Sequence, residues 1–178
     1  FYFKKSKIPE FNELKSILKK INNFSPDIII AIGGGSVIDL AKIVSVLDLR
    51  LIKDLKKKLM SYKSISRKKL YPLIAIPTTA GAGAEVTSNS VIYINKVKYS
   101  VENVLLIPDY FFLFPNLIIN NPFRIKSSAG FDAIAQGVES LISLKSNYKS
   151  VFYAKKSLKL SLKNYLSFLK KPNKINSK

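Results

Sequence analysis

Two glycine-rich stretches of the chain have the composition of an anion-binding site. In the first, "GGGS" at residues 33–36 stands between the apolar run "DIIIAI" and the helix-like "SVIDLAK". The first N–H groups of a helix lack intrahelical acceptors, the helix dipole favours negative charge, and glycine lets a phosphate approach the backbone. A strand, a glycine turn and a helix in this order predict a phosphate site. A tight turn that binds nothing is the simpler alternative.

The second stretch, "TTAGAGAE" at residues 78–85, follows the next apolar run, "LYPLIAIP" at 70–77. Its many small residues predict a loop rather than a helix or strand. Ligands of an α/β sheet bind outside the carboxyl ends of its strands, at a switch in strand order. Two loops of this kind, each after a buried strand, predict that one dinucleotide is held by both.

A third group of polar residues lies in "GFDAIAQGVES" at residues 130–140. Asp132 and Gln136 are four residues apart and therefore share a face of the predicted helix, with Glu139 on roughly the same side. Polar residues at this spacing more often mark a solvated face than a site. The chain has no histidine and no cysteine, so metal or proton chemistry would have to use Asp, Glu, Lys, Tyr or residues outside this chain.

The apolar pattern predicts the elements that would position these residues. An amphipathic helix over 9–21, a strand buried on both faces over 25–32, a helix over 36–48 and a second buried strand over 70–77 are expected. This alternation is typical of an α/β domain with a parallel sheet.

The rest of the chain predicts a hairpin and then helices. The hairpin turns at Asn95-Lys96, with Val91, Tyr93 and Val97 flanking the turn, and an apolar strand broken by Pro108 follows within 104–114. The lysine-rich stretch 54–64 is expected to be a helix or loop, 127–146 and 150–171 are expected to be helices, and the tail at 171–178 to be frayed. The change of pattern predicts an α/β domain over 1–123 and the beginning of an all-helical domain over 124–178.

Composition limits the class of protein. The chain has 178 residues, of which 47% are hydrophobic, and no apolar run approaches the roughly 18 residues needed to span a bilayer. We therefore expect a soluble, cytoplasmic protein without a membrane partner. The net charge of +19 suggests nucleic-acid binding, but the lysines are spread over the polar positions of helical patterns, which favours a solvated surface.

Together the three segments resemble the iron-containing (group III) alcohol dehydrogenase family. "GGGSVIDLAK" is similar to its GGGSxxDxAK loop, "IPTTAGAGAEVT" to its IPTTAGTGSEVT loop, and "GFDAIAQGVES" to the helix with its first metal ligand. The resemblance implies a dehydroquinate synthase-like architecture: an α/β domain that binds NAD or NADP, then a helical domain that completes a divalent metal site. It also implies metal-assisted hydride transfer between a small alcohol and an aldehyde or ketone, and a homodimer in intact relatives.

The same resemblance assigns roles to individual residues. The pyrophosphate would contact the glycine turn at Gly33, Gly34, Gly35 and Ser36, and the cofactor crevice would be lined by Asp39 and Lys42 of the following helix. Phosphate or ribose would be contacted by Thr78 and Thr79. Lys98 on the hairpin would lie near the ribose. Asp132 would be the first ligand of iron or zinc.

Several departures from the family pattern leave alternatives open. Gln136 stands where relatives commonly have a histidine, and a glutamine oxygen is a poorer ligand for iron or zinc than imidazole. A DAxxQ pattern resembles relatives that handle phosphonate aldehydes, such as phosphonoacetaldehyde reductase, so an anionic substrate is the alternative. Ala82 and Ala84 replace the usual Thr and Ser of the second loop.

The missing histidines suggest a fragment in which no catalytic site is complete. It would lack the family's first strand and helix and end about half way through a family member. A catalytically silent, nucleotide-binding remnant is then the alternative from another class. A dehydroquinate-synthase-like or glycerol-dehydrogenase-like protein is disfavoured by "IPTTAGAGAE", and a nucleic-acid binder comes last.

Overall fold

A computed structural model describes residues 1–47, 57 and 68–172. The chain forms two compact units. The first unit comprises Phe1–Pro77 and Ala84–Phe112, and the second comprises Thr78–Gly83 and Leu113–Lys178. The assignment of a cofactor domain to 1–123 and a helical domain to 124–178 stays a prediction.

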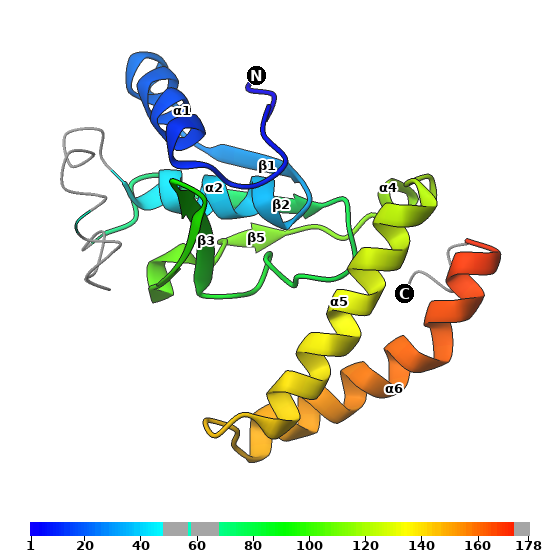
Figure 1. The fold of residues 1–178 in the computed structure, drawn as a ribbon. Helices are drawn as coiled ribbons and strands as arrows, with labels where there is room; N and C mark the ends of the chain where they lie inside the picture. Colours follow the sequence, from blue (N-terminus) through cyan, green and yellow to red (C-terminus); the bar gives the residue numbers. More distant parts are fainter. Residues whose placement is uncertain (48–56, 58–67, 173–178) are drawn as a thin grey trace. The chain divides into compact units, whose positions relative to one another are not determined.

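The first unit contains the parallel sheet that the sequence predicts. Its strands β1 (Ile29–Gly33), β2 (Leu73–Pro77) and β5 (Tyr110–Phe111) lie in the order β1-β2-β5, and both pairings are parallel. Helix α2 (Gly35–Val46) crosses one face of this sheet (Figure 1). The α/β class is therefore confirmed, and the strands at 25–32 and 70–77 are shorter than expected.

The prediction that the first strand is buried on both faces is wrong. Ala31 is buried under α2, but Ile30 and Ile32, which point to the other face, are 56% and 59% exposed. Helix α1 (Phe11–Phe24) packs on α2 and on the hairpin instead of covering that face. A continuous apolar run allows both faces of a strand to be buried, but which face is buried depends on the elements that pack against it.

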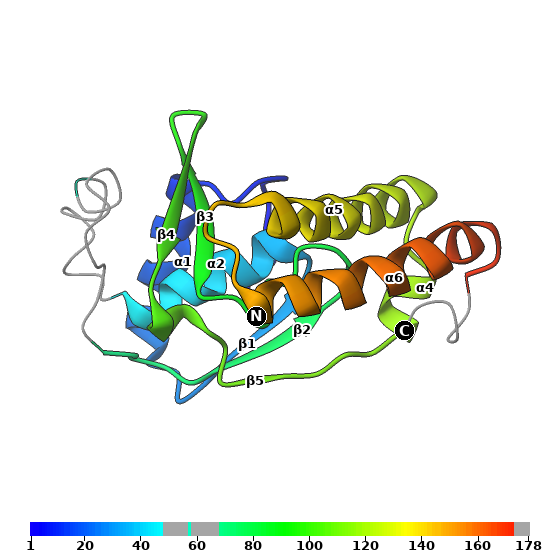
Figure 2. The ribbon, with the colours of Figure 1, turned by 90° about the horizontal axis from the view of Figure 1, so that it is seen from below.

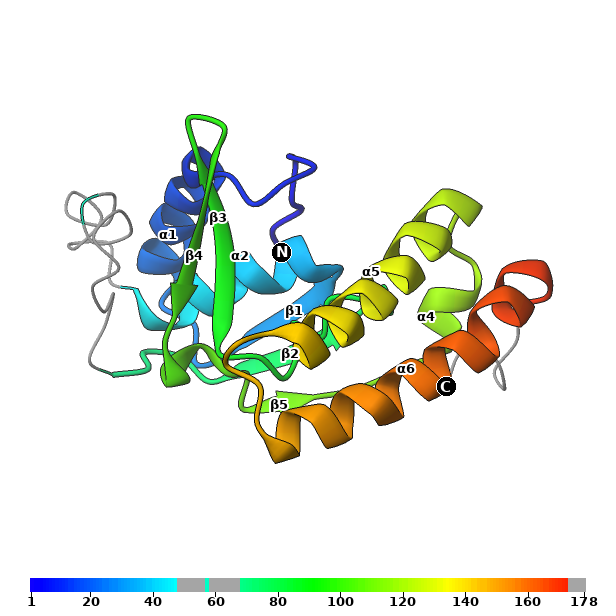
Figure 3. The same cartoon turned by 60° about the horizontal axis from the view of Figure 1, so that its bottom comes forward.

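The hairpin consists of β3 (Asn89–Ile94) and β4 (Val97–Glu102), which pair antiparallel (Figure 3). Asn95 and Lys96 have φ of 50° and 66°, the positive values that a tight two-residue hairpin turn requires. The predicted turn is thus confirmed. Ile92 and Ile94 are buried, while Val97, which the sequence places beside the turn, is 53% exposed.

The core of the first unit lies between α1, α2 and the hairpin. It is made of buried aliphatic side chains from four elements and one short helix, namely Leu14, Leu18, Leu40, Ile43, Val44, Val46, Leu47, Ile92, Ile94, Val101 and Leu106. The short helix is η2 (Val104–Leu106), a 3-10 turn in the stretch predicted as a strand. The Asn103 side chain accepts a hydrogen bond from Leu105 N–H at 2.9 Å, so this local cap favours a turn over a longer strand.

The second unit is helical, as the sequence predicts. After α4 (Asn116–Ile119), helices α5 (Phe123–Ile142) and α6 (Tyr148–Lys170) pack side by side (Figure 2). Asn147 and Ser150 cap α6 reciprocally through their side chains. The stretch 54–64, apart from residue 57, and the tail from residue 173 lie outside the described residues.

Two glycines of α5 allow the close approach of α6. A Cβ at Gly130 would lie 2.6 Å from the ring of Tyr165, and a Cβ at Gly137 would lie 2.8 Å from Cγ of Leu158. These distances are shorter than van der Waals contact, and the two glycines are seven residues apart, about two helical turns. The α5–α6 pairing therefore depends on small residues along one stripe of α5.

A leucine at Gly137 is expected to destabilise this helix pair. We expect Gly137→Leu to lower the free energy of unfolding by about 1–3 kcal/mol, because the added side chain overfills the α5–α6 contact. Urea unfolding followed by circular dichroism measures the effect. Val138→Leu, at a neighbouring position that is 44% exposed, is the matched control and should change little. Equal stability of the two variants would contradict the close-packing role.

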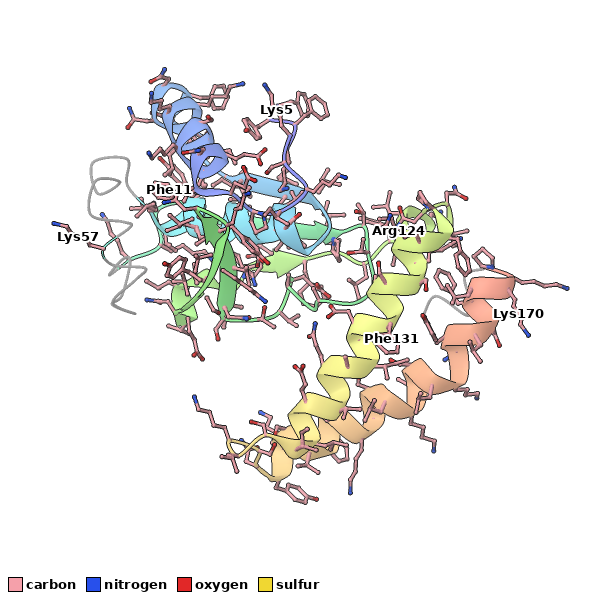
Figure 4. The ribbon with its side chains drawn as sticks, in the orientation of Figure 1. Lys5, Phe11, Lys57, Arg124, Phe131 and Lys170 are labelled. Atoms are coloured by element: carbon pink, nitrogen blue, oxygen red, sulfur yellow. The ribbon has the colours of Figure 1, made fainter. Side chains whose placement is uncertain are left out.

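The surface of the described residues is rich in lysine. Lys57 and Lys170 extend outward from the ribbon (Figure 4), whereas Lys42 is fully buried. No helix in the described part of the chain combines the length and the apolar composition that crossing a membrane requires.

Candidate functional site

The glycine turn leads directly from β1 into α2. Gly34 is the N-cap of α2, and no side chain caps the helix there. The Gly34 carbonyl accepts hydrogen bonds from Val37 N–H at 3.0 Å and Ile38 N–H at 3.2 Å. Gly35 and Ser36 come before Val37 and Ile38 in the chain. Their N–H groups belong to the first turn of the helix, where no preceding helical carbonyl is available as an acceptor. This helix start therefore has the geometry of an anion site.

Packing and backbone conformation constrain Gly33 and Gly34 of the turn differently. A Cβ at Gly33 would lie 2.6 Å from Cγ2 of Val37, so glycine there is explained by packing at the start of α2. Gly34 has φ of −75° and ψ of −178°, a conformation that any residue adopts. Backbone freedom thus does not explain Gly34. Packing against Val37 accounts for Gly33 even in a turn without a ligand.

The second loop begins at the same edge of the sheet as the first. In the parallel β1–β2 pair, Gly33 is the register partner of Pro77, and Thr78 follows Pro77 in the chain. The carboxyl ends of the two strands therefore coincide. This is the position at which α/β sheets bind ligands.

Within the second unit, described residues contact the loop at 78–83 at Thr78 and at Gly81. The Thr78 carbonyl accepts a hydrogen bond from Asn121 Nδ2 at 2.6 Å. A Cβ at Gly81 would lie 2.4 Å from the Ala129 carbonyl oxygen of α5. Sequence reasoning missed Asn121, because an asparagine 43 residues away from the loop carries no local signal for this contact.

Lys42 lies about two helical turns after the start of α2 and makes three hydrogen bonds. Its side chain is 0% exposed. Its Nζ donates to the Thr87 carbonyl and to Thr87 Oγ1, both at 2.9 Å, and to the Asn89 carbonyl at 3.0 Å. In this arrangement the ammonium group presents no surface to a bound molecule.

Asp39 lies one helical turn before Lys42 and is half-buried. Burial raises the pKa of Asp39 to about 6, and Lys42, the N–H of Val91 and the charge of Lys98 partly offset this rise. Lys98 itself is exposed on β4, where it pairs with Tyr93 of β3. The structure therefore brings the predicted residues Asp39, Lys42 and Lys98 into one electrostatic group beside α2.

The predicted metal residues lie on an exposed part of α5. Gln136 Nε2 donates to Asp132 Oδ2 at 2.8 Å, and both side chains lie at least partly open to solvent, as does Glu139. Among the residues that the structure describes, no group of three His, Cys, Asp or Glu side chains could hold a metal ion. One carboxylate and one amide do not fit a complete iron or zinc site, so the described residues supply at most a part of one.

The parallel sheet and its two strand-end loops define the chain as a Rossmann-like α/β protein. The family model for iron-containing alcohol dehydrogenase matches residues 2–115, and the chain belongs to this family.

Relatives and solved structures of this family match the chain over most of its length. An alcohol dehydrogenase from Thermococcus barophilus is 36% identical over 164 residues, which are 87% of this chain and 42% of the relative. An iron-containing alcohol dehydrogenase of Thermotoga maritima is 28% identical with a TM-score of 0.84, over 99% of this chain and 48% of that one.

A third match was solved with a bound nucleotide. The sulfoacetaldehyde reductase of Bifidobacterium kashiwanohense in complex with NAD+ is 25% identical with a TM-score of 0.86, over 97% of this chain and 46% of that one. The chain thus spans a little under half the length of each of these three proteins.

Proposed function

We propose that the chain carries the cofactor-binding part of an NAD- or NADP-dependent oxidoreductase that interconverts an alcohol and an aldehyde or ketone in the cytoplasm. The observation that carries this proposal is the pairing of Gly33 with Pro77, which starts both small-residue loops at one edge of the sheet. Membership of the iron-containing alcohol dehydrogenase family supports the reaction type. The NAD+ complex of the sulfoacetaldehyde reductase supports the cofactor.

In this proposal the glycine turn binds the pyrophosphate. The N–H groups of Gly35 and Ser36 donate to its oxygens, and Gly33 and Gly34 keep side chains away from the approaching phosphate. A charged anion at this helix start is further stabilised by the helix dipole, by roughly 0.3–1 kcal/mol.

Four further residues are proposed to position the rest of the cofactor. Thr78 and Thr79 offer hydroxyl groups immediately after the strand end at Pro77, where they would contact phosphate or the nicotinamide ribose. Asp39 and Lys98 offer an acceptor and a donor beside α2 for the cofactor hydroxyls. The bound nicotinamide would supply the hydride acceptor or donor, while the protein fixes its orientation.

Asp132 is proposed as one ligand of a divalent cation, with Gln136 beside it. The remaining ligands would have to come from outside the described residues, because these hold no three-ligand group. Asp132 then contributes a single carboxylate oxygen on an accessible helix face.

A small anionic aldehyde, such as a phosphonate aldehyde, is the second candidate substrate. Two observations favour it over a plain alcohol. Gln136 is hydrogen-bonded to Asp132 at the usual histidine position, and a structural neighbour is a sulfoacetaldehyde reductase. The net charge of +19 would also attract an anion.

Binding of NADH and NADPH to the chain tests the proposal. We expect a rise and a blue shift of nicotinamide fluorescence when either cofactor binds. Single-stranded DNA at increasing salt is the control. Steeply salt-dependent DNA binding without cofactor binding would overturn the proposal. Cofactor binding without turnover, on an alcohol panel with added Fe²⁺ or Zn²⁺, would favour the silent nucleotide-binding protein.

A further inference from the structure

Lys42 uses its full hydrogen-bonding capacity inside the first unit. A lysine ammonium has three donors and no acceptor. The three partners are the Thr87 carbonyl, Thr87 Oγ1 and the Asn89 carbonyl, all within 3.0 Å of Nζ. Thr87 lies just before β3 and Asn89 is the first residue of that strand, 45 and 47 residues further along the chain than Lys42. One side chain of α2 thus fixes the segment Thr87–Asn89 from inside.

Stability alone is a poor reason for this arrangement. Removing an ammonium from water costs several kcal/mol, and apolar residues of similar volume often replace buried charges without loss of stability. Burial lowers the pKa of Lys42 to about 8, and the charges of Asp39 and Glu85 offset only a part of this effect. The charge is therefore held at a cost, which points to a role in positioning.

The segment that Lys42 holds also determines where Asp39 is placed. Val91 lies two residues after Asn89 in β3, and its N–H donates to the Asp39 carboxylate. The buried Ser90 hydroxyl donates to the Asp39 carbonyl at 2.8 Å. Movement of Thr87–Asn89 would therefore be transmitted to Asp39 through β3 and to the preceding loop through the chain.

We propose that Lys42 is a positioning residue of the cofactor site, which holds the Thr87–Asn89 segment against α2 without touching the cofactor. This inference rests on the proposed function and gives Lys42 a role different from lining the cofactor crevice, which is the role that the family resemblance implies. Lys42 acts through Asp39 and through the end of the small-residue loop. The charged groups around it are Asp39 on its own helix and Glu85 on the loop, with Lys98 of β4 beyond Asp39.

Lys42→Met, which keeps most of the volume and removes the donors, is the first test. We expect NADH to bind about tenfold more weakly, since hydrogen bonds from a charged donor are lost. Amide hydrogen exchange should become faster at Thr87, Asn89 and Val91 and stay unchanged in β1. Lys19→Met, at an exposed position of α1, is the matched control and should bind NADH as the original chain does.

Thr87→Val is the second variant and carries the test if Lys42→Met does not fold. It removes one of the three acceptors and leaves both carbonyls, so a weakening of NADH binding by roughly threefold is expected. If both variants bind NADH as tightly as the original chain and amide exchange is unchanged, the positioning role is overturned.

Two further measurements distinguish a positioning role of Lys42 from a purely structural role and from direct contact with NADH. They are the pH dependence of NADH affinity and the NMR resonance of the Lys42 amine. As the pH rises through about 8, Lys42 loses a proton and one donor, so NADH affinity of the original chain should fall. This inflection should be absent from Lys42→Met. The Lys42 ¹⁵Nζ resonance should titrate over the same range without a nuclear Overhauser effect to NADH. A nuclear Overhauser effect between the Lys42 amine protons and NADH would show direct contact and would overturn the proposal.

The outcomes also separate this proposal from the proposed function. If the original chain binds neither NADH nor NADPH, the proposed function fails and the cofactor role of Lys42 fails with it. If the original chain binds NADH and both variants bind it equally well, only the role of Lys42 is overturned.

Discussion

Gly34→Val is expected to abolish NADH binding by this chain, with a loss of affinity of at least about 100-fold. Gly34 is the N-cap of α2 and has backbone angles that valine can adopt. The branched side chain would stand at the helix start and keep a phosphate away from the N–H groups of Gly35 and Ser36. A lost set of hydrogen bonds to a charged group is worth several kcal/mol. Titration of nicotinamide fluorescence measures the loss.

Gly34→Ala is the graded control for this substitution. Its single methyl group should weaken NADH binding much less than valine does, and both variants should keep the circular dichroism spectrum of the original chain. Valine and alanine are poorer N-caps than glycine by about 1 kcal/mol, a cost that urea unfolding reports separately from binding. Retained NADH affinity in folded Gly34→Val would contradict a pyrophosphate site at this turn.

Gly81→Ala is expected to lower the free energy of unfolding of the second unit by about 1–3 kcal/mol. The new Cβ would lie 2.4 Å from the Ala129 carbonyl oxygen of α5. Because that oxygen belongs to a helix backbone, no rotation of a side chain can relieve the contact. The loop at 78–83 must then move away from α5, and the hydrogen bond from Asn121 to the Thr78 carbonyl is expected to weaken with it. Chemical unfolding followed by circular dichroism measures the change.

Gly83→Asn is the matched control in the same loop. Gly83 has φ of +60°, and a Cβ at this position would meet no described atom within 4 Å. Asparagine tolerates left-handed backbone angles better than other residues with a Cβ, so this variant should lose less than about 1 kcal/mol. If Gly81→Ala is as stable as the original chain, the close approach of the loop to α5 is contradicted.

The local features of the chain could be predicted from the sequence, since they depend on neighbouring residues. The parallel sheet follows from apolar runs separated by helical patterns, and the hairpin turn at Asn95-Lys96 lies where the pattern predicts it. The segment 104–114 is the exception. Its first part forms a 3-10 turn capped by Asn103 and its second part a strand of only two residues, because a side-chain cap and Pro108 compete with strand pairing.

The candidate site could be predicted only in part. The glycine turn at 33–36 and the loop at 78–85 could be recognised, because each comes directly after a predicted strand. If the two strands are parallel neighbours, both segments must begin at the same edge of the sheet. The partners of Lys42 were not recognisable, since they lie 45 and 47 residues further along the chain. The same holds for Asn121 and its bond to Thr78. These contacts depend on which surfaces meet after folding.

The sequence by itself determined the α/β class, the order of the loops and the family, because residue type, periodicity and short motifs act within a few residues of each other. Only the tertiary structure decided that Ile30 and Ile32 stay exposed, that Gly33 is required by packing against Val37, and that Lys42 faces inward. The physical reason is that burial, close approach and the pairing of a charge depend on how whole elements pack, which short stretches of sequence do not specify.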